Sequence, residues 1–558
     1  MSEPTPFWFG PEDRRLFGWL HAPAGGVHAG VVLCPPLGYE YVCAYRTYVL
    51  LARRLTDAGF AVLRFDYDGT GDSVGDDQDP ARVDAWLASI RAAVEEMRGR
   101  GVDELALVGM RAGALLAAVA AETCEVSDLV LWDPATSGRS YLREMQMLHM
   151  VGVGVDDQAR PEGEIEVAGI VFRAGTTSDL RGLDLAKLKR LQADNVLVLS
   201  RPDRTVAKSV AEKLDELATT TWIDAVGQEQ VVDVVSVQTV VPDRSVNDIV
   251  SWLEQRHPAA AGMLADAPFV TSAVVGHAPT GEAIVERPVR LGPLGLFAIT
   301  TEPEGAPPTP WLVGLNNATD HHIGPNRMWV DLGRRWAGIG HRSVRLDLSG
   351  IGDSPARPGQ AENRSYAPEA FDDVVEALKA LSPDDPHDAV LTGLCSGGYL
   401  AVDVGAIFGV RMICAVNPDL RYKPDDVLVG SGDSKNTRTA PPTRRLVRPL
   451  SGSHLADRIG HWLPPKVWFA LDRLGLHNTP AKGLEVLVAK GTYVLLVYGD
   501  DHTYPRLRDR SATVLNQLES SPHFEIAHVP GMDHALMISR HRDRLADLLT
   551  DRLLGLAN

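Results

Sequence analysis

The sequence predicts two tandem α/β domains, each with a mostly parallel sheet flanked by helices. The chain has 558 residues, which is more than one hydrophobic core usually holds. Short aliphatic runs alternate with helical patterns, as expected for strands that are buried on both faces of a parallel sheet. The same order of features recurs after about 280 residues, which indicates a duplicated domain and not a short-repeat solenoid.

Each copy has a first strand, a helix, a second strand that ends in a Gly-rich turn, and a third strand that ends in Gly. In the first copy these elements are expected at residues 30–34, 45–58, 61–66 and 105–109. In the second copy they are expected at residues 311–315, 327–337, 343–347 and 389–393. Turn-rich sequence around residues 258–285 separates the copies, so we expect domains at 1–270 and 280–558.

The composition argues against several classes of protein. A net charge of −18 argues against nucleic acid as a partner, because phosphate binding needs clustered Lys and Arg. The first residues lack the pattern of a secretory signal, and no apolar run approaches a membrane span of about 20 residues. The five cysteines never occur in CxxC spacing, which favours a reducing cytoplasm over disulfides or zinc. We expect no metal and no cofactor.

One segment departs from the acidic balance of the chain. Residues 421–490 contain 12 Lys or Arg and 6 Asp or Glu, which gives a local charge of +6. Two interpretations stay open at this point. The segment is either a solvated, irregular insertion or a lid that attracts an anionic ligand or an acidic carrier.

A candidate nucleophile lies in the second copy. Gly393-Leu-Cys395-Ser396-Gly397 separates an expected strand from an expected helix, which is the context of a nucleophile elbow. Glycines fit this tight turn because larger side chains would collide with the neighbouring strand and helix. We therefore expect Cys395 to be the nucleophile and the Ser396 amide to face the developing oxyanion. The alternative is a small buried cysteine in a Gly-rich turn.

A nucleophile of this kind needs a base, and the base needs an acid that orients it. In this type of fold, acid and base follow the nucleophile along the chain. Asp501 comes just after an expected strand and is the better candidate acid, with Asp500 as the runner-up. His534 follows the next expected strand, where the base should lie.

The loop after the first strand of the second copy is expected to supply another oxyanion donor. Asn317 and Ala318 are the most plausible donors, and the sequence does not choose between them. His321 and His322 in the same loop either line the pocket or serve only the loop itself.

The matching turn of the first copy carries no nucleophile. Gly109-Met-Arg111-Ala-Gly113 keeps both glycines, but a guanidinium is always protonated and cannot attack a carbonyl. Asp203 still resembles the acid, whereas the stretch around residues 241–246 has no histidine. Arg111 either binds a carboxylate or phosphate or pairs with a nearby Asp. We expect this copy to be a degenerate domain that packs against the other copy or shapes its entrance.

These motifs carry a family resemblance. In the first copy, Cys34-Pro-Pro-Leu-Gly-Tyr-Glu and Arg64-Phe-Asp-Tyr-Asp-Gly-Thr-Gly-Asp-Ser resemble exosortase-associated hydrolases of the α/β-hydrolase superfamily. In the second copy, Ile323-Gly-Pro-Asn-Arg and Arg345-Leu-Asp-Leu-Ser-Gly-Ile-Gly-Asp-Ser resemble a sister group. The resemblance implies two tandem α/β-hydrolase-fold domains, of which the second is catalytic. Cys395 departs from the usual serine, although the superfamily includes cysteine members such as dienelactone hydrolases and some carrier-protein thioesterases.

A cysteine nucleophile favours acyl transfer from a thioester. Attack by Cys395 exchanges one thioester for another with little change in free energy, so the acyl group stays activated for an acceptor or for water. The expected donor is an acyl-CoA or an acyl carrier protein, and the expected acceptor is a small molecule. A cysteine-dependent hydrolase of esters, lactones or amides is one alternative, and a non-catalytic binding or scaffold protein is another.

Overall fold

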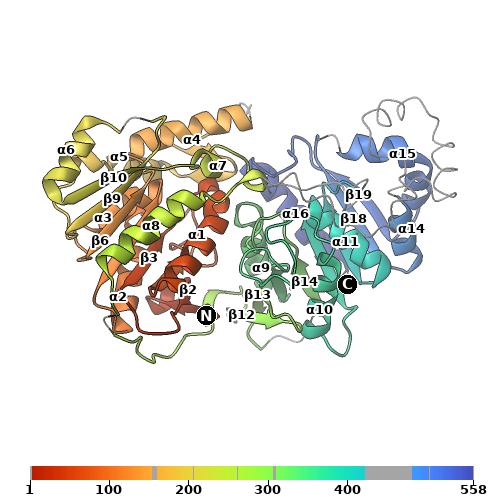
Figure 1. Cartoon of the computed structure of the whole chain (residues 1–558). Helices are drawn as coiled ribbons and strands as arrows, with labels where there is room; N and C mark the ends of the chain where they lie inside the picture. The colour runs from red at the N-terminus through yellow and green to blue at the C-terminus, as the bar shows by residue number, and fades with distance from the viewer. Residues whose placement is uncertain are drawn as a thin grey trace, which may run out of the picture.

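The computed structural model contains two α/β halves that lie side by side (Figure 1). It describes residues 3–153, 160–204, 206–260, 262–305, 309–420, 481–501 and 503–556. The predicted fold class is confirmed, because each half has a mostly parallel sheet with helices on both faces. The segment predicted as a lid, 421–490, lies outside the described residues except for its last ten, which include helix α14 (Ala481–Ala489).

The first sheet has eight strands, and β2 runs antiparallel to both of its neighbours while the other pairs are parallel. The spatial order is β1 (Thr5–Phe9), β2 (Leu16–His21), β4 (Ala61–Phe65), β3 (Gly30–Cys34), β5 (Leu105–Met110), β6 (Asp128–Trp132), β9 (Asn195–Ser200) and β10 (Thr219–Asp224). The aliphatic runs predicted as strands lie in its centre, where Val31, Val32 and Leu33 are fully buried.

The second sheet repeats this order with one added antiparallel strand, β11, at its edge. Its strands are β11 (Ala273–His277), β12 (Ala283–Leu291), β13 (Leu296–Pro303), β15 (Ser343–Leu346), β14 (Trp311–Gly314), β16 (Ala389–Leu394), β17 (Met412–Val416), β18 (Tyr493–Tyr498) and β19 (Phe524–His528). The pairs from β15 to β19 are all parallel. Their carboxyl ends therefore meet at one edge, where ligands bind in open α/β sheets.

Helices cover both faces of each sheet. In the first half, one face packs against α1 (Tyr39–Asp57), α7 (Glu229–Val232) and α8 (Asp243–Arg256). The other face packs against α2 (Arg82–Gly99), α3 (Ala112–Ala120), α4 (Gly138–Gly152), α5 (Ala174–Gly182) and α6 (Lys208–Leu217). A small hairpin, β7 (Ile165–Val167) and β8 (Ile170–Phe172), follows α4.

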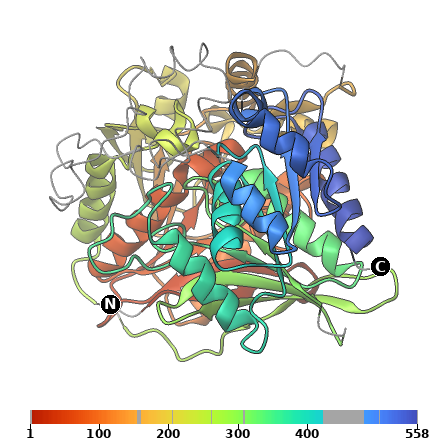
Figure 2. The ribbon, with the colours of Figure 1, turned by 90° about the vertical axis from the view of Figure 1, so that its right-hand side faces the viewer.

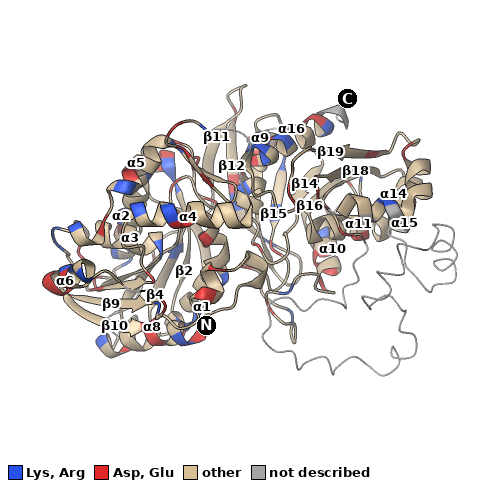
Figure 3. Cartoon of the chain, turned by 90° about the horizontal axis from the view of Figure 1, so that it is seen from above, with Lys and Arg blue, Asp and Glu red and all other residues tan. Residues whose placement is uncertain are grey.

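In the second half, α9 (Met328–Ala337) and α16 (Ser539–Leu556) cover one face of the sheet. Helices α10 (Ala370–Leu381), α11 (Ser396–Ile407), α14 and α15 (Thr503–Leu518) cover the other face. In Figure 2 the second half lies in front of the first. Acidic and basic residues are interspersed over the helices of both halves (Figure 3). None of the described helices is long and apolar enough to cross a membrane.

The halves meet through a reciprocal pair of ion pairs. Arg345 Nη2 lies 2.9 Å from Asp72 in the other half, and Arg64 Nη2 lies 2.5 Å from Asp353. Each arginine precedes the Gly-rich turn of its own half, and each aspartate ends the turn of the opposite half. The two copies therefore contact each other through equivalent surfaces, as subunits do in a two-fold symmetric dimer.

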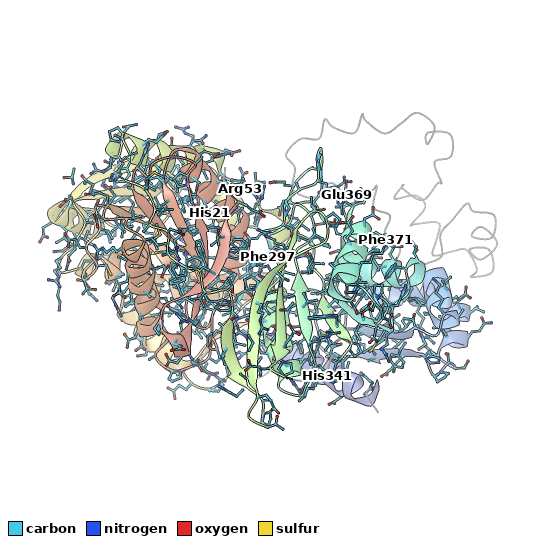
Figure 4. The ribbon with its side chains drawn as sticks, turned by 90° about the horizontal axis from the view of Figure 1, so that it is seen from below. His21, Arg53, Phe297, His341, Glu369 and Phe371 are labelled. Atoms are coloured by element: carbon cyan, nitrogen blue, oxygen red, sulfur yellow. The ribbon has the colours of Figure 1, made fainter. Side chains whose placement is uncertain are left out.

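Aromatic side chains fill the space beside these ion pairs. Trp19 and Phe297 have ring centroids 4.6 Å apart, and Phe17 lies 6.5 Å from Phe297. Phe17 and Phe297 are equivalent positions, because the amide of each donates to the serine that ends its own Gly-rich turn. Figure 4 shows Phe297 where the two halves meet. These buried apolar and charged contacts join the halves into one core region.

Candidate active site

The turn that carries Cys395 is strained and closely packed. It joins β16 to α11. Cys395 has φ +54° and ψ −110°, a backbone conformation that residues other than glycine rarely adopt. A Cβ at Gly393 would lie 2.2 Å from the Gly397 backbone, and one at Gly397 would lie 2.7 Å from the Asn316 carbonyl. Only glycine therefore fits at both positions, and the thiol projects at the carboxyl edge of the sheet.

The structure brings His534 and Asp501 to this thiol from separate loops. His534 Nδ1 lies 2.6 Å from Asp501 Oδ2, and Asp501 Oδ1 also accepts the Thr503 amide at 3.0 Å. Hydrogen bonds to Asp501 and Cys395 raise the pKa of His534 to about 10. An imidazole that contacts both a thiol and a carboxylate is the arrangement of an activated cysteine nucleophile.

Asp500 lies elsewhere. Its carboxylate accepts the Gly531 amide at 2.7 Å and lies 3.0 Å from His528 Nε2. Of the two candidate acids, Asp501 is therefore the one that contacts His534. The Asp501 carboxylate is largely buried, and its hydrogen bonds with His534 and Thr503 hold its pKa below the usual value although burial opposes this.

The expected oxyanion donors lie next to the thiol. Ser396 is the first residue of α11, so its amide has no partner within the helix. The Ala318 amide donates to the Ser396 hydroxyl at 2.7 Å, which places this second donor beside the same turn. Asn317 directs its side-chain amide to Asp320 at 3.2 Å. The geometry therefore favours the Ala318 amide over Asn317 as the partner of Ser396.

Sequence reasoning missed Asn417, which follows β17 and is fully buried. Its side-chain amide donates to the carbonyls of Asp533 and His534, both at 3.3 Å, and its carbonyl oxygen accepts the Gly499 amide at 3.0 Å. Asn417 therefore ties the histidine loop to the end of β18, just before Asp501. Its place at the end of a buried strand, before a proline, was the available signal.

Tyr366 was also missed. Its hydroxyl lies 3.7 Å from the Cys395 sulfur, in a loop that no local pattern links to the nucleophile. Tyr366, Ser396 and Ala318 line a cavity of about 570 Å³ that is open to solvent. Leu348, Ile351, Phe371 and Leu400 form much of its apolar wall, and Figure 4 labels Phe371 in the first turn of α10. The cavity offers space for an organic group beside the thiol.

His321 and His322 do not line this cavity. His322 is buried between the halves, with its ring nitrogens 2.7 Å from Asp72 and 2.8 Å from Asp347. His321 stacks on Tyr45 of the first half at a centroid distance of 3.6 Å. Of the two readings of these histidines, the described geometry supports a role in the loop and the domain interface over one at the thiol.

Two comparisons with protein families place this geometry in context. Residues 305–548 match a family model described as "Alpha/beta hydrolase family", and residues 29–217 match one described as "Serine aminopeptidase, S33". Both halves of the chain belong to the α/β-hydrolase superfamily. This membership suggests hydrolase activity. The closer resemblance to exosortase-associated hydrolases stays a prediction, and no curated protein matches the chain.

Solved α/β-hydrolase structures are similar to single halves. Est1E from Butyrivibrio proteoclasticus, with ferulic acid bound, is 16% identical with a TM-score of 0.35 and covers 45% of this chain and 96% of its own. XC6422 from Xanthomonas campestris, described as a serine hydrolase without a lid, is 18% identical with a TM-score of 0.29, over 46% and 97%. Proline iminopeptidase from Mycobacterium smegmatis is 13% identical with a TM-score of 0.32, over 46% and 100%.

The first α/β-hydrolase half keeps the elbow but fills it with a buried cation. Arg111 has φ +56° and ψ −121°, and it is 2% exposed. Its guanidinium lies 2.8 Å from Glu40, 2.6 Å from Glu144 and 3.5 Å from Asp133. These carboxylates raise its pKa further above the usual value although burial opposes this. Of the two readings of Arg111, the structure supports pairing with neighbouring carboxylates, two of which are glutamates.

Asp203 does not orient a histidine. Its carboxylate accepts hydrogen bonds from Arg201 at 2.9 and 2.8 Å, and its side chain is 63% exposed. Helix α8 begins at Asp243, within the stretch where the sequence lacks a base. The first half therefore keeps the strand–turn–helix architecture of a nucleophile elbow. Among its described residues, Arg111 stands in place of a nucleophile and Asp203 pairs with Arg201 in place of a histidine.

Proposed function

We propose that the second half catalyses acyl transfer through a thioacyl-enzyme. In this proposal Cys395 is the nucleophile, His534 exchanges protons with the thiol and the acceptor, and Asp501 orients the imidazole. The observation that carries the proposal is the contact of one imidazole with both the thiol at a strained elbow and a largely buried carboxylate. That combination is the geometry of an activated nucleophile.

The first half-reaction forms the covalent intermediate. The Cys395 thiolate attacks the carbonyl carbon of an acyl thioester, and the carbonyl oxygen becomes an oxyanion that the amides of Ser396 and Ala318 stabilise. In this step the Ser396 hydroxyl gives up the hydrogen bond that it accepts from the Ala318 amide, so that this amide can donate to the oxyanion. The bond from the carbonyl carbon to the donor sulfur then breaks. The donor leaves as a thiol, with a proton supplied by His534.

The second half-reaction regenerates the thiolate. His534 takes a proton from an acceptor amine or hydroxyl, or from water, and the acceptor attacks the thioacyl carbon. The carbon–sulfur bond to Cys395 breaks, and His534 returns to its protonated form beside the thiolate. Because the intermediate is itself a thioester, it keeps the acyl group activated. Serine would store the same group as a less reactive ester.

The expected donors are an acyl-CoA or an acyl carrier protein, and the expected acceptor is a small molecule. The apolar part of the cavity beside Cys395 suits the acyl group. The basic segment 421–490, predicted to attract the phosphates or acidic surface of a donor, lies mostly outside the described residues. Its role is part of the proposal.

Intact-mass measurement tests the proposal. The protein is incubated with acetyl-, butyryl- and longer acyl-CoA and with acyl carrier protein, and the adduct is mapped by peptide mass. We expect one acyl group on Cys395, none in Cys395→Ala, and unchanged labelling in Cys124→Ala, because Cys124 is a buried thiol of the other half. Absence of an adduct from every donor, with simple esters still hydrolysed, would contradict the proposal.

Acceptor dependence separates transfer from hydrolysis. Free thiol and free acid are measured together, with and without a panel of amines and alcohols. Transfer predicts that an acceptor raises thiol release and lowers the yield of free acid. Release of acid at a rate that no acceptor changes would favour the alternative, a cysteine-dependent hydrolase. A biological function that survives Cys395→Ala would favour a binding or scaffold protein.

A further inference from the structure

The loop that carries His534 is fixed at three points, and one of them lies in the other half of the chain. Its first point is Asn417, which binds the carbonyl of His534. Its second is Asn326, whose side-chain amide donates to the Leu536 carbonyl at 3.2 Å. Its third is Glu166 of the first half, whose carboxylate accepts the Ser539 amide at 2.6 Å.

Glu166 lies on the β7–β8 hairpin of the first half, which reaches the start of α16 in the second half. The Glu166 side chain is almost fully buried and is also paired with Arg160. Burial of a carboxylate is costly unless it is paired, so the contacts with Arg160 and with the Ser539 amide fix the position of the Glu166 side chain. Ser539 is the first residue of α16, where a carboxylate also interacts favourably with the helix dipole.

The tip of the hairpin makes a second contact, with the first turn of α16. Gly169 at the turn has φ +88°, and its carbonyl accepts Arg542 Nη1 at 3.0 Å. A Cβ at Gly169 would lie 2.3 Å from the Asn326 amide nitrogen and 3.0 Å from the Leu536 carbonyl. Only glycine therefore allows the hairpin to approach the histidine loop this closely. Met537 of the loop, in turn, packs against the apolar core of the first half.

We infer that the first half positions the catalytic histidine of the second, with Glu166 as a positioning residue for His534. The degenerate half thus supplies part of the site without supplying a reacting group. The inference rests on the proposed function, because it takes His534 as the partner of the Cys395 thiol. A displacement of about 1 Å at such a position can cost about 100-fold in rate.

The test measures thiol reactivity, which does not require any acyl donor. The rate of Cys395 alkylation by iodoacetamide is followed from pH 5 to 10, because the described groups that face His534 are the Asp501 carboxylate and this thiol. We expect Glu166→Ala to slow alkylation at neutral pH by about tenfold and to move the profile toward higher pH. We expect Glu166→Gln, which keeps an acceptor for the Ser539 amide, to restore most of the wild-type profile.

A matched control comes from the same hairpin. Glu164 precedes β7 and pairs with Arg173 of the same half at 2.8 Å, so Glu164→Ala should leave the profile unchanged. If Glu166→Ala does not fold, Gly169→Ala tests the same contact from the hairpin tip and should slow alkylation as well. Wild-type profiles in both Glu166→Ala and Gly169→Ala would overturn the inference. A failure of the acyl-transfer proposal alone would show instead as normal alkylation without any acyl adduct.

A separate observation concerns the acyl group itself. Arg364 lines the cavity beside Cys395, and its Nε is buried without a hydrogen-bond partner. Among the described residues, no carboxylate pairs with it. Asp403 lines the same cavity, and burial raises the pKa of its carboxyl, which favours the neutral form. An unpaired guanidinium in a partly apolar cavity is the group that binds a carboxylate or phosphate most strongly.

We propose that Arg364 selects acyl groups that end in a carboxylate. Succinyl-CoA and butyryl-CoA test this, because both carry four-carbon acyl groups and only one is charged at its end. The wild-type chain should acylate Cys395 about tenfold faster or more from succinyl-CoA, since a charge-assisted hydrogen bond contributes about that factor. Arg364→Met should bring the ratio of the succinyl rate to the butyryl rate close to one, and Asp403→Asn should keep the wild-type ratio.

Two outcomes would overturn this second proposal. One is a wild-type chain that reacts equally with both donors, and the other is an equal slowing of both in Arg364→Met. If neither donor forms an adduct, the acyl-transfer proposal itself fails. The same experiment therefore separates an error about the acyl group from an error about the reaction.

Discussion

The elbows of the two halves have nearly the same backbone and opposite chemistry. Arg111 and Cys395 have φ values of +56° and +54°, and each follows a central strand and precedes a helix. The guanidinium of Arg111 is buried among three carboxylates, whereas the thiol is half-buried and faces an imidazole. The strained bend is therefore compatible with loss of the nucleophile. What differs is the side chain at the bend and the groups at the ends of the neighbouring strands.

The ends of β6 and β17 show the same contrast. Asp133 and Asn417 both have φ +43°, and a proline follows each. Asp133 contributes negative charge beside Arg111, while the neutral Asn417 holds the histidine loop of the second half. The first half thus has a buried charge cluster where the second half has the thiol, the imidazole and Asn417. Substitutions at the two elbows should accordingly affect different properties.

The largest expected effect is on catalysis at Cys395. Cys395→Ala should lower the rate of thiol release from an acyl-CoA by about 1,000-fold or more, because it removes the nucleophile of a coupled group. Arg111→Lys, which keeps the buried charge, should retain activity near the wild-type level. Thiol release is measured with a chromogenic disulfide, and folding is checked by thermal melting. Activity of Cys395→Ala within tenfold of the wild type would mean that another group is the nucleophile.

The next effect is on stability at Arg111. Arg111→Met leaves the buried Glu40 and Asp133 carboxylates and the half-buried Glu144 carboxylate without their shared cation, which should cost about 3 kcal/mol in the free energy of unfolding. Urea unfolding of the first half, followed by its tryptophans, measures this. Adding Glu40→Gln to Arg111→Met should recover part of the loss by removing one uncompensated charge. Equal stability of the wild type and Arg111→Met would show that the cluster does not stabilise the fold.

Local sequence patterns predicted the elements that build the elbow. The central strands and the thiol turn follow from aliphatic runs and glycine spacing, and β3, β5 and β16 lie where these patterns place them. The order of Asp501 and His534 after the strands also placed both residues in loops at one edge of the sheet, where the structure joins them. These features depend on nearby residues and on chain order.

Contacts between the halves could not be predicted in this way. The pairing of Arg64 with Asp353 and of Arg345 with Asp72 joins residues more than 270 positions apart, and each motif alone looks like a local turn. The same holds for Glu166 and Ser539, which no periodicity connects. The antiparallel hairpin β12–β13 was missed as well, because β12 contains Glu286, Arg287 and Pro288 and its burial does not alternate along the strand.

A smaller effect distinguishes the acids. Asp501→Asn should slow acylation by about 100-fold, because His534 loses the carboxylate that holds its pKa near 10. With a lower His534 pKa, less imidazolium is present at neutral pH to assist the thiol. Alkylation of Cys395 should therefore require a higher pH. Asp500→Asn and Asp203→Asn should both leave this profile unchanged, and a shift in Asp500→Asn equal to that in Asp501→Asn would contradict the assignment.

The last prediction concerns stability at the interface between the halves. The two halves differ there, because the imidazole of His322 binds Asp347 of the second half and no histidine binds the equivalent Asp66 among the described contacts of the first half. His322 binds Asp72 and Asp347, and these carboxylates raise its pKa to about 10 although burial opposes this. A raised pKa in the folded state means that protonation of His322 stabilises the fold fully below about pH 6.5. This contribution is lost as pH rises through 10.

The corresponding carboxylate of the first half, Asp66, is bound instead by the Tyr41 hydroxyl at 2.6 Å. Burial and the neighbouring Asp72 raise the pKa of Asp66 to about 7, so its contribution to stability is lost as pH rises from about 4 to about 7, below the range in which the contribution of His322 is lost. His322→Asn should therefore flatten the fall in the unfolding free energy between pH 7 and 10 and leave the fall below pH 7 in place. The change is measured by urea unfolding at each pH. If the wild type and His322→Asn lose stability in parallel, the ring is not charged in the folded chain, and the two carboxylates must share a proton in its place.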